Sequence, residues 1–174
     1  ATKISFINQL SNICQKIPEA NIDDIGKTIG LDPRIGKLFL NAGPGYGGSC
    51  LPKDMKALIN FAKASGINPT LLNAVEEVNT KQLEQIILMI KQKLGNLASK
   101  KITILGTAFK PNTDDIRDSI AIELIKKLLN KKAKIIIHDP KAMKNTQRIF
   151  KEKINYAKTI EDALAKSQCV IIMT

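Results

Sequence analysis

The residues from Phe39 to Asp54 combine a glycine-rich loop with a cysteine and two charged side chains. They read F-L-N-A-G-P-G-Y-G-G-S-C-L-P-K-D, with four glycines among positions 43 to 48. Glycines let a backbone approach a ligand closely and turn its amide groups toward an anion, so we expect this loop to bind a phosphate group. The loop also satisfies G-x-G-x-x-G, but helical patterns follow it, and this argues against a dinucleotide-binding fingerprint.

Cys50 is the candidate nucleophile of this loop. Pro52 marks a helix start, and the positive end of that helix together with the Lys53 ammonium favours a thiolate over a thiol. Asp54 follows one helical turn later, where it can hold a water or accept a proton beside the sulfur. The alternatives are a small residue tolerated in a loop for Cys50 and a favourable first-turn acid for Asp54. Cys14 and Cys169 lie in apolar patterns and are expected in the core.

The only histidine, His138, ends an apolar run and has no partner that the sequence identifies. A Cys-His hydrolase therefore has little support. The three cysteines have neither a metal-ligand spacing nor an even count, which predicts no metal site and reduced thiols in a cytoplasmic compartment. No apolar run is long enough to span a membrane, and no signal peptide is visible.

The composition favours a core of aliphatic side chains. Hydrophobic residues make up 44% of the 174 residues but aromatic residues only 4%, and tryptophan is absent. Such a core suits helices packed on helices or on a parallel sheet. The net charge of +11 attracts anions at low salt. The lysines are scattered along helical patterns with little aromatic interleaving, so we expect a solvated basic surface and no nucleic-acid partner.

Four helical patterns fill the first hundred residues. The first, residues 1–17, places apolar side chains at Ile4, Ile7, Leu10, Cys14 and Ile17 and begins without a capping residue. The others are expected over residues 21–29, 53–65 and 70–94, with a loop rich in glycine and proline between residues 31 and 51. The first pattern predicts a helix that continues a larger protein.

The pattern changes after Lys101. Apolar runs at residues 102–105, 134–138 and 169–173 alternate with a helical pattern at 120–129, and short turns separate them. Strands that alternate with helices predict a parallel α/β unit. We therefore expect an α/β protein that is truncated at both ends, with a helical domain over residues 1–98, a parallel α/β domain over residues 99–174 and a long helix joining them.

Two motifs resemble the UDP-glucose 6-dehydrogenase family. Residues 47–54, G-G-S-C-L-P-K-D, resemble its active-site segment, and residues 105–119, L-G-T-A-F-K-P-N-T-D-D-I-R-D-S, resemble the opening of its UDP-binding domain. The resemblance extends over the whole chain. It implies a helical central dimerisation domain and a Rossmann-like UDP-binding domain, in an enzyme of UDP-glucuronate and polysaccharide biosynthesis.

The resemblance also implies a mechanism. Two successive NAD molecules oxidise UDP-glucose to UDP-glucuronate, through a thiohemiacetal and then a thioester on Cys50, while Asp54 positions or activates water. Lys53 and Arg117 match cofactor contacts, and Arg34 matches an arginine that reaches the substrate in a neighbouring subunit. The remaining substrate contacts correspond to Phe39, Leu40, Asn41, Ala42, Gly43, Gly47 and Lys110. A homodimer or a larger homo-oligomer is expected, with the long helix near residues 70–94 as its surface.

Some features depart from the family pattern. An N-terminal NAD-binding domain and a Lys and Asn pair expected before Ala1 are missing, so we expect these 174 residues alone to be inactive. Asn41 stands where many relatives have Lys. Leu51 stands where UDP-glucose enzymes often have Phe and GDP-mannose 6-dehydrogenases have Leu. Ser49 disfavours N-acetylmannosamine enzymes, which usually have His there. GDP-mannose oxidation, a non-catalytic nucleotide-sugar module and a basic nucleic-acid binder remain the alternatives.

Overall fold

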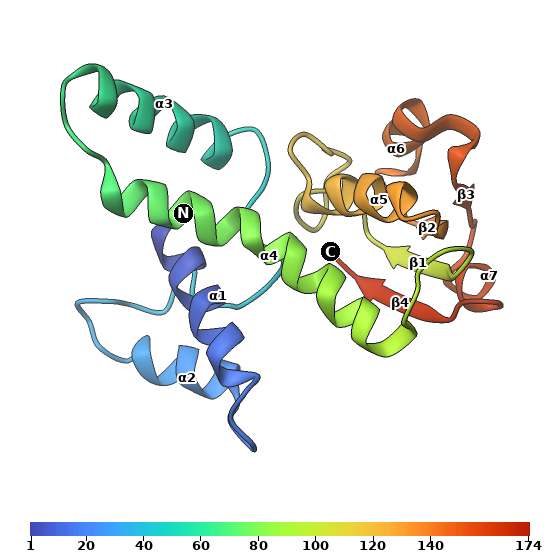
Figure 1. Cartoon of the computed structure of the whole chain (residues 1–174), viewed down its shortest axis with the longest axis horizontal. Helices are drawn as coiled ribbons and strands as arrows, with labels where there is room; N and C mark the ends of the chain where they lie inside the picture. The colour runs from blue at the N-terminus through green and yellow to red at the C-terminus, as the bar shows by residue number, and fades with distance from the viewer. The chain divides into compact units, whose positions relative to one another are not determined.

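The computed structural model describes all residues, 1–174, and divides into two compact units. The first unit contains residues 1–46 and 51–84, and the second contains residues 47–50 and 85–174. Figure 1 shows their elements, which are α1 (Thr2–Cys14), α2 (Ile22–Ile29), α3 (Leu51–Ala64), α4 (Thr70–Leu94), β1 (Lys101–Leu105), α5 (Ile120–Asn130), β2 (Lys134–His138), α6 (Met143–Phe150), the 3-10 helix η1 (Lys151–Lys153), β3 (Asn155–Tyr156), α7 (Ile160–Leu164) and β4 (Cys169–Ile172).

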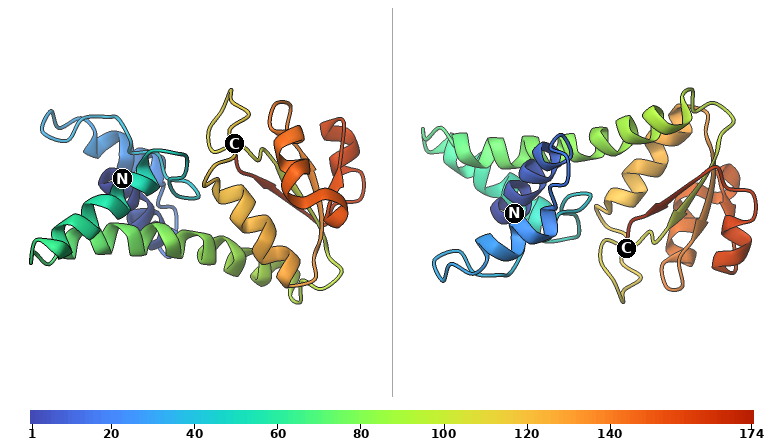
Figure 2. Two further views of the ribbon diagram at one scale, coloured as in Figure 1. Left: turned by 90° about the horizontal axis from the view of Figure 1, so that it is seen from above. Right: turned by 90° about the horizontal axis from the view of Figure 1, so that it is seen from below.

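The first unit contains helices only. Figures 1 and 2 show α1 and α3 lying against the first half of α4. Its apolar centre consists of Tyr46, Met55, Ile59 and Val75, and partly buried residues of α1 and α4 pack around it. The amino end of α2 is capped by Asn21, whose side-chain oxygen accepts a hydrogen bond of 2.8 Å from the Asp23 amide.

The buried face of α1 is partly polar, and here the sequence prediction was wrong. The helix ends at Cys14, and Ile17, expected on the buried stripe, lies beyond it and is 54% exposed. Ile7 and Cys14 are buried as expected, but the same face also buries Ser5, Asn8 and Ser11. A search for an apolar stripe misses these polar residues, although Ser5 bonds to the Val75 carbonyl of α4 and Asn8 to the Gly43 amide of the glycine-rich loop.

The second unit is built on a four-stranded parallel sheet with the order β3-β2-β1-β4. Ile102 of β1 pairs with Ile135 of β2 on one side and with Cys169 of β4 on the other. Figure 1 shows α5 drawn across β1 and β2. Its buried residues pack with those of the strands into one aliphatic core, as the composition predicted. The predicted parallel α/β arrangement is therefore confirmed.

Two differences at element level affect the site. Helix α3 begins at Leu51, two residues before the predicted start, so Cys50 directly precedes the helix. The short elements β3, α6 and α7 were not predicted. Strand β3 and helix α7 have too few residues to show a periodicity, whereas the amphipathic pattern of α6 was overlooked. None of the helices combines the length and the hydrophobicity that crossing a bilayer requires.

Candidate functional site

The glycine-rich loop of the first unit is held by side-chain amides from two helices. The amide of Gly43 donates to Asn8 Oδ1 of α1 at 2.8 Å, and its carbonyl accepts from Gln82 Nε2 of α4 at 3.0 Å. The amide of Tyr46 donates to Asn79 Oδ1 at 2.7 Å, and Asn79 Nδ2 donates back to the Tyr46 carbonyl at 3.1 Å. Gly43 and Tyr46 are thus each fixed at their backbone donor and at their backbone acceptor.

Tyr46 anchors the same loop through its side chain. Its ring is 4% exposed, and its hydroxyl donates to Glu76 Oε2 at 2.7 Å. Burial, the hydrogen bond to Glu76 and the charge of that carboxylate together raise the pKa of Tyr46, so the phenol stays protonated. Gly45 precedes it with φ of +114°, and a β-carbon there would lie 2.7 Å from Asn79 Oδ1. The loop therefore requires glycine at position 45.

In the second unit, Gly47 and Gly48 pack against the second sequence motif. A β-carbon on Gly47 would lie 2.2 Å from the Asp118 carbonyl oxygen, and one on Gly48 would lie 2.6 Å from the Phe109 ring. Neither position has room for a side chain. The structure thus brings the Gly47 to Cys50 segment next to the turn that contains Phe109 and Lys110, more than fifty residues away in the chain.

Cys50 is exposed to solvent, and its sulfur lies 3.7 Å from Ser49 Oγ. The guanidinium of Arg117 is held by Asp115, with Nε and Nη2 donating to the two carboxylate oxygens at 3.0 and 2.6 Å. This hydrogen-bonded pair lowers the pKa of Asp115 to about 2. Asp115 is also the main cause that raises the pKa of Arg117, and the electrostatic interaction with Cys50 is a smaller one. Arg117 therefore lies within electrostatic reach of the sulfur.

Lys110 lines a cavity of about 530 Å³ in the second unit. The cavity lies at the carboxyl ends of three strands, which end at Leu105, His138 and Ile172. The chain passes from β1 to β2 on one side, whereas β4 lies on the other side of β1, so this is the point where open parallel sheets bind ligands. The ammonium of Lys110 lies 5.3 Å from the centre of the Phe109 ring.

Asp139 fixes the turn after β1. One of its carboxylate oxygens accepts from the amides of Thr107 and Ala108 at 2.6 and 3.2 Å. The other accepts from the amides of Lys141 and Ala142 at 2.8 and 2.7 Å. Burial opposes ionisation of this carboxyl, but the four backbone hydrogen bonds outweigh it and lower the pKa of Asp139. An ionised, buried carboxylate thus joins the ends of β1 and β2.

The predicted substrate residues of the first unit lie in different environments. Leu40 is buried, whereas Phe39 is 64% exposed and has φ of +65°, an unusual backbone conformation for an aromatic residue. Leu40 and Asn41 line a cavity of about 450 Å³, together with Lys27 and Lys37. Of these loop residues, Phe39 is exposed to solvent, Asn41 lies at the cavity, and Leu40 is buried and lines the same cavity.

Three charged residues of the prediction form local ion pairs on the surface of the first unit. Arg34 makes a forked hydrogen-bonded pair with Asp32, which lowers the pKa of that carboxyl. Lys53 Nζ lies 3.3 Å from Asp54 Oδ1, and both side chains are exposed. All of these groups are accessible to a ligand that replaces the ion pair.

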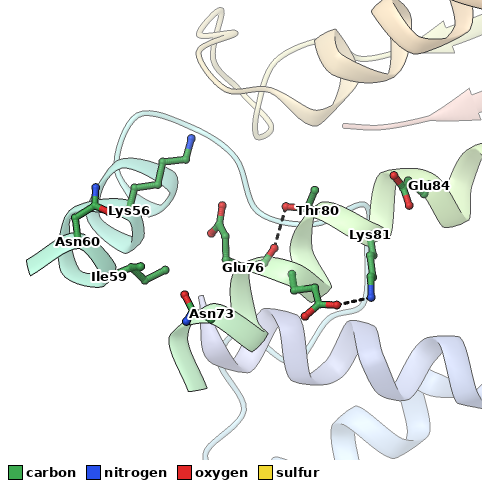
Figure 3. Close-up of a pocket in the computed structure, with 9 residues that line it drawn as sticks. Lys56, Ile59, Asn60, Asn73, Glu76, Thr80, Lys81 and Glu84 are labelled. Carbon is green, nitrogen blue, oxygen red and sulfur yellow. Dashed lines mark hydrogen bonds and ion pairs between the residues drawn. The ribbon is translucent and has the colours of Figure 1, made fainter. Parts of the chain in front are cut away.

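A further cavity of the first unit contains none of the predicted site residues. It measures about 560 Å³ and lies between α3 and α4. Figure 3 shows Lys56, Ile59 and Asn60 on α3 and Glu76 and Thr80 on α4 around it. Its connection to the loop is through Glu76, which accepts the hydrogen bond from the Tyr46 hydroxyl.

Sequence reasoning missed several residues that shape the site. Asn8, Asn79 and Gln82 were overlooked, although polar residues on the buried face of a helix are a signal. Asp139 was also missed. His138, for which the sequence identified no partner, has Nδ1 at 3.1 Å from the Ala157 carbonyl oxygen. Cys14 is buried as predicted, while Cys169 is only partly buried.

Two family descriptions match most of the chain. Residues 1–81 match the central domain of the UDP-glucose/GDP-mannose dehydrogenase family, and residues 103–174 match the UDP binding domain of the same family. Among curated proteins, the whole chain is 41% identical to UDP-glucose 6-dehydrogenase YwqF from Bacillus subtilis and 44% identical to UDP-glucose 6-dehydrogenase AglM from Haloferax volcanii. It spans 39% and 40% of the lengths of these two relatives.

Solved structures give the same result. A UDP-glucose dehydrogenase from the hyperthermophilic archaeon Pyrobaculum islandicum matches 98% of the chain with a TM-score of 0.95 and 34% identity, and the match covers 39% of that structure. A GDP-mannose dehydrogenase from Pseudomonas aeruginosa matches 98% of the chain with a TM-score of 0.71, and 41% of that structure is covered. Its identity of 24% shows a shared fold only.

Proposed function

The chain belongs to the UDP-glucose/GDP-mannose dehydrogenase family, and from this membership we propose that it supplies the nucleophile and the nucleotide-sugar site of an enzyme that oxidises UDP-glucose to UDP-glucuronate. The observation that supports this most is the exposed thiol of Cys50, on a segment that packs beside the Phe109 and Lys110 turn. The oxidation proceeds in two steps, and Cys50 retains the intermediate between them.

Each step follows from thiol chemistry. Loss of hydride and a proton converts the primary alcohol of the sugar to an aldehyde, and the Cys50 thiolate adds to the aldehyde carbon to form a thiohemiacetal. Loss of a second hydride and of the hydroxyl proton converts this adduct to a thioester. Water then attacks the thioester carbonyl, the carbon–sulfur bond breaks, and the carboxylate and the thiol are released. Asp54 positions or deprotonates this water.

NAD, when bound, accepts the hydride in each oxidation. Lys53 and Arg117 are the residues of this chain that we assign to it, because both are exposed cations that can meet phosphate oxygens. Arg117 lies within electrostatic reach of Cys50, so a phosphate bound there would lie near the reacting sulfur. We expect the 174 residues alone not to produce NADH, since the rest of an NAD site must come from elsewhere.

The substrate is assigned to two groups of residues. Phe39, Leu40, Asn41, Ala42 and Gly43 with Gly47 form the loop contacts, and Lys110 offers a cation from the cavity of the second unit. Arg34 is assigned to the substrate of a neighbouring subunit in a homodimer or larger homo-oligomer. The domain boundary between residues 98 and 99, the cytoplasmic location and the oligomer remain predictions.

An exchange chimera tests the activity. These 174 residues replace the matched 174 residues of the Bacillus subtilis relative, and NADH production is followed with UDP-glucose and with GDP-mannose. We expect activity with UDP-glucose and none in the Cys50→Ala variant. Leu51 supports the rival substrate, so activity with GDP-mannose alone would replace our assignment. A Cys50→Ala chimera that retains full activity would leave only the non-catalytic binding role.

A further inference from the structure

We propose that Asn8, Asn79 and Gln82 are positioning residues that set the geometry of the glycine-rich loop for nucleotide-sugar binding. This inference rests on the proposed function, because it assigns a purpose to the loop. None of the three residues belongs to the two sequence motifs. They come from α1 and α4, and together they form what we call the amide clamp.

The amide clamp acts on the backbone N–H and the backbone C=O of two residues. Gly43 is held between Asn8 and Gln82, with distances of 2.8 and 3.0 Å, and Tyr46 is held by Asn79 alone, with distances of 2.7 and 3.1 Å. A carboxamide offers a donor and an acceptor on separate atoms of one planar, uncharged group. It can therefore hold a peptide group in one orientation, which an aliphatic side chain cannot do.

A second set of contacts holds the clamp itself. Gln82 accepts from Asn12 Nδ2 of α1 at 3.2 Å, so its amide is oriented before it reaches Gly43. Asn8, Asn79 and Gln82 are all buried. Rotamers of buried side chains are restricted by their neighbours, and a restricted group can hold a ligand loop more accurately than a mobile one.

Asn8 shows that the arrangement is not optimised for stability. It is fully buried, and its Nδ2 has no hydrogen-bond partner among the protein atoms. A buried donor without a partner is destabilising, and an apolar residue at position 8 would avoid it. What Asn8 offers in return is one acceptor for the Gly43 amide, a group of the exposed loop that water could also satisfy. Asn8 therefore serves to fix the position of the loop rather than to stabilise helix α1.

The position of the clamp relates it to the chemistry. Gly43 is one of the residues assigned to the substrate, and Tyr46 lies four residues before Cys50. Gly45, between the two clamped peptides, has no space for a β-carbon because Asn79 Oδ1 occupies it. The clamp thus defines the path of the backbone from the ligand loop toward the nucleophile.

The test compares Gln82→Met and Asn79→Leu with a matched control, Ser5→Ala. Ser5 Oγ donates to the Val75 carbonyl at 2.8 Å, a buried hydrogen bond between the same two helices that does not touch the loop. Folding of each variant of the 174-residue chain is checked by circular dichroism. Amide hydrogen exchange is then measured at Gly43 and Tyr46, and the affinity for UDP-glucose by calorimetry.

We expect exchange to accelerate by about tenfold at Tyr46 in Asn79→Leu, which removes the acceptor of that amide, whereas the Gly43 amide keeps its acceptor, Asn8, in both variants. We expect UDP-glucose to bind about tenfold more weakly in both. Ser5→Ala should lose stability but leave loop exchange and affinity unchanged. The inference is wrong if both clamp variants bind as the parent does, or if Ser5→Ala changes the loop equally. If the parent chain does not bind UDP-glucose while the exchange pattern holds, the clamp stands and the proposed function is overturned.

Discussion

The ring of Phe109 lies where a β-carbon on Gly48 would have to be, with the two positions 2.6 Å apart. This contact joins the segment that carries Cys50, the proposed nucleophile, to the turn that carries Lys110. It also places the two sequence motifs next to each other in the structure, although nothing within either motif indicates this contact. A larger residue at position 48 would push the two motifs apart.

Gly48→Ala is therefore expected to be destabilising. The new β-carbon would meet the Phe109 ring, and φ of +86° is unfavourable for alanine. We expect a loss of about 1–3 kcal/mol in the free energy of unfolding, measured by urea denaturation. Gly43→Ala is the control, because nothing lies within 4 Å of its β-carbon position. Equal stabilities of the two variants would contradict the packing of Gly48 on Phe109.

Gly26→Ala should destabilise the chain, although the same change inside a helix is usually stabilising. Replacing a glycine inside a helix with alanine normally stabilises by about 1 kcal/mol. In α2, however, the β-carbon would lie 2.7 Å from the Leu40 carbonyl oxygen, so the loop would have to move. We expect a lower melting temperature than that of the parent chain, whereas the exposed Thr28→Ala on the same helix stays within about 0.5 kcal/mol. A stabilised Gly26→Ala would show that Leu40 is not fixed against α2.

Asp139→Asn should be destabilising in a pH-dependent way. The pKa of Asp139 lies below its ordinary value of 3.8 in the folded chain, so its ionised form contributes stability above that value and loses it as the pH falls through the lower folded pKa. In asparagine one of the two oxygens is replaced by an NH2 group, which cannot accept hydrogen bonds from the backbone amides. We expect the free energy of unfolding to fall by about 2 kcal/mol. Urea denaturation from pH 7 to pH 3 should show a constant difference from the parent chain at neutral pH and a smaller one in acid. A difference that grows in acid would have the wrong sign for this carboxylate.

The three thiols should react with iodoacetamide in a fixed order. Cys50 is exposed and should be alkylated first. Burial raises the pKa of the Cys169 thiol, so its thiolate is scarce and its reaction slower. Cys14 is 6% exposed and should react only on unfolding. Peptide mass spectrometry gives the order, and UDP-glucose should protect Cys50 but not Cys169. Early labelling of Cys14 would be inconsistent with the packing of α1.

Much of the fold was predictable because buried parallel strands have a simple signal. Strands β1 and β2 are continuous apolar runs, and the structure places both as predicted. Strand β3 has only two residues, Asn155 and Tyr156, and no periodicity can be read from two positions. The buried face of α1 was misread for a different reason. The side chain of Asn8 accepts a hydrogen bond from a loop 35 residues later in the chain. The sequence of the helix alone cannot predict that contact.

The four glycines in six positions were interpreted as a backbone that approaches a phosphate ligand, and that role stays a prediction. The structure shows close approach to protein groups, with a specific obstacle each at Gly45, Gly47 and Gly48. The obstacles themselves, which are Asn79, Asp118 and Phe109, lie 34, 71 and 61 residues away in the chain, as the numbering shows. Pairing of this kind depends on tertiary structure, so no motif or spacing within the loop could identify them.

The amide clamp has one more consequence, which concerns electrolytes and acidity. Its three side chains cannot titrate between about pH 3 and pH 10, and a hydrogen bond between neutral amides is almost insensitive to ionic strength. The chain as a whole carries a net charge of +11, whose field salt will weaken. Buffers that alter how strongly the chain attracts an anionic ligand should therefore leave the shape of the loop that receives it unchanged.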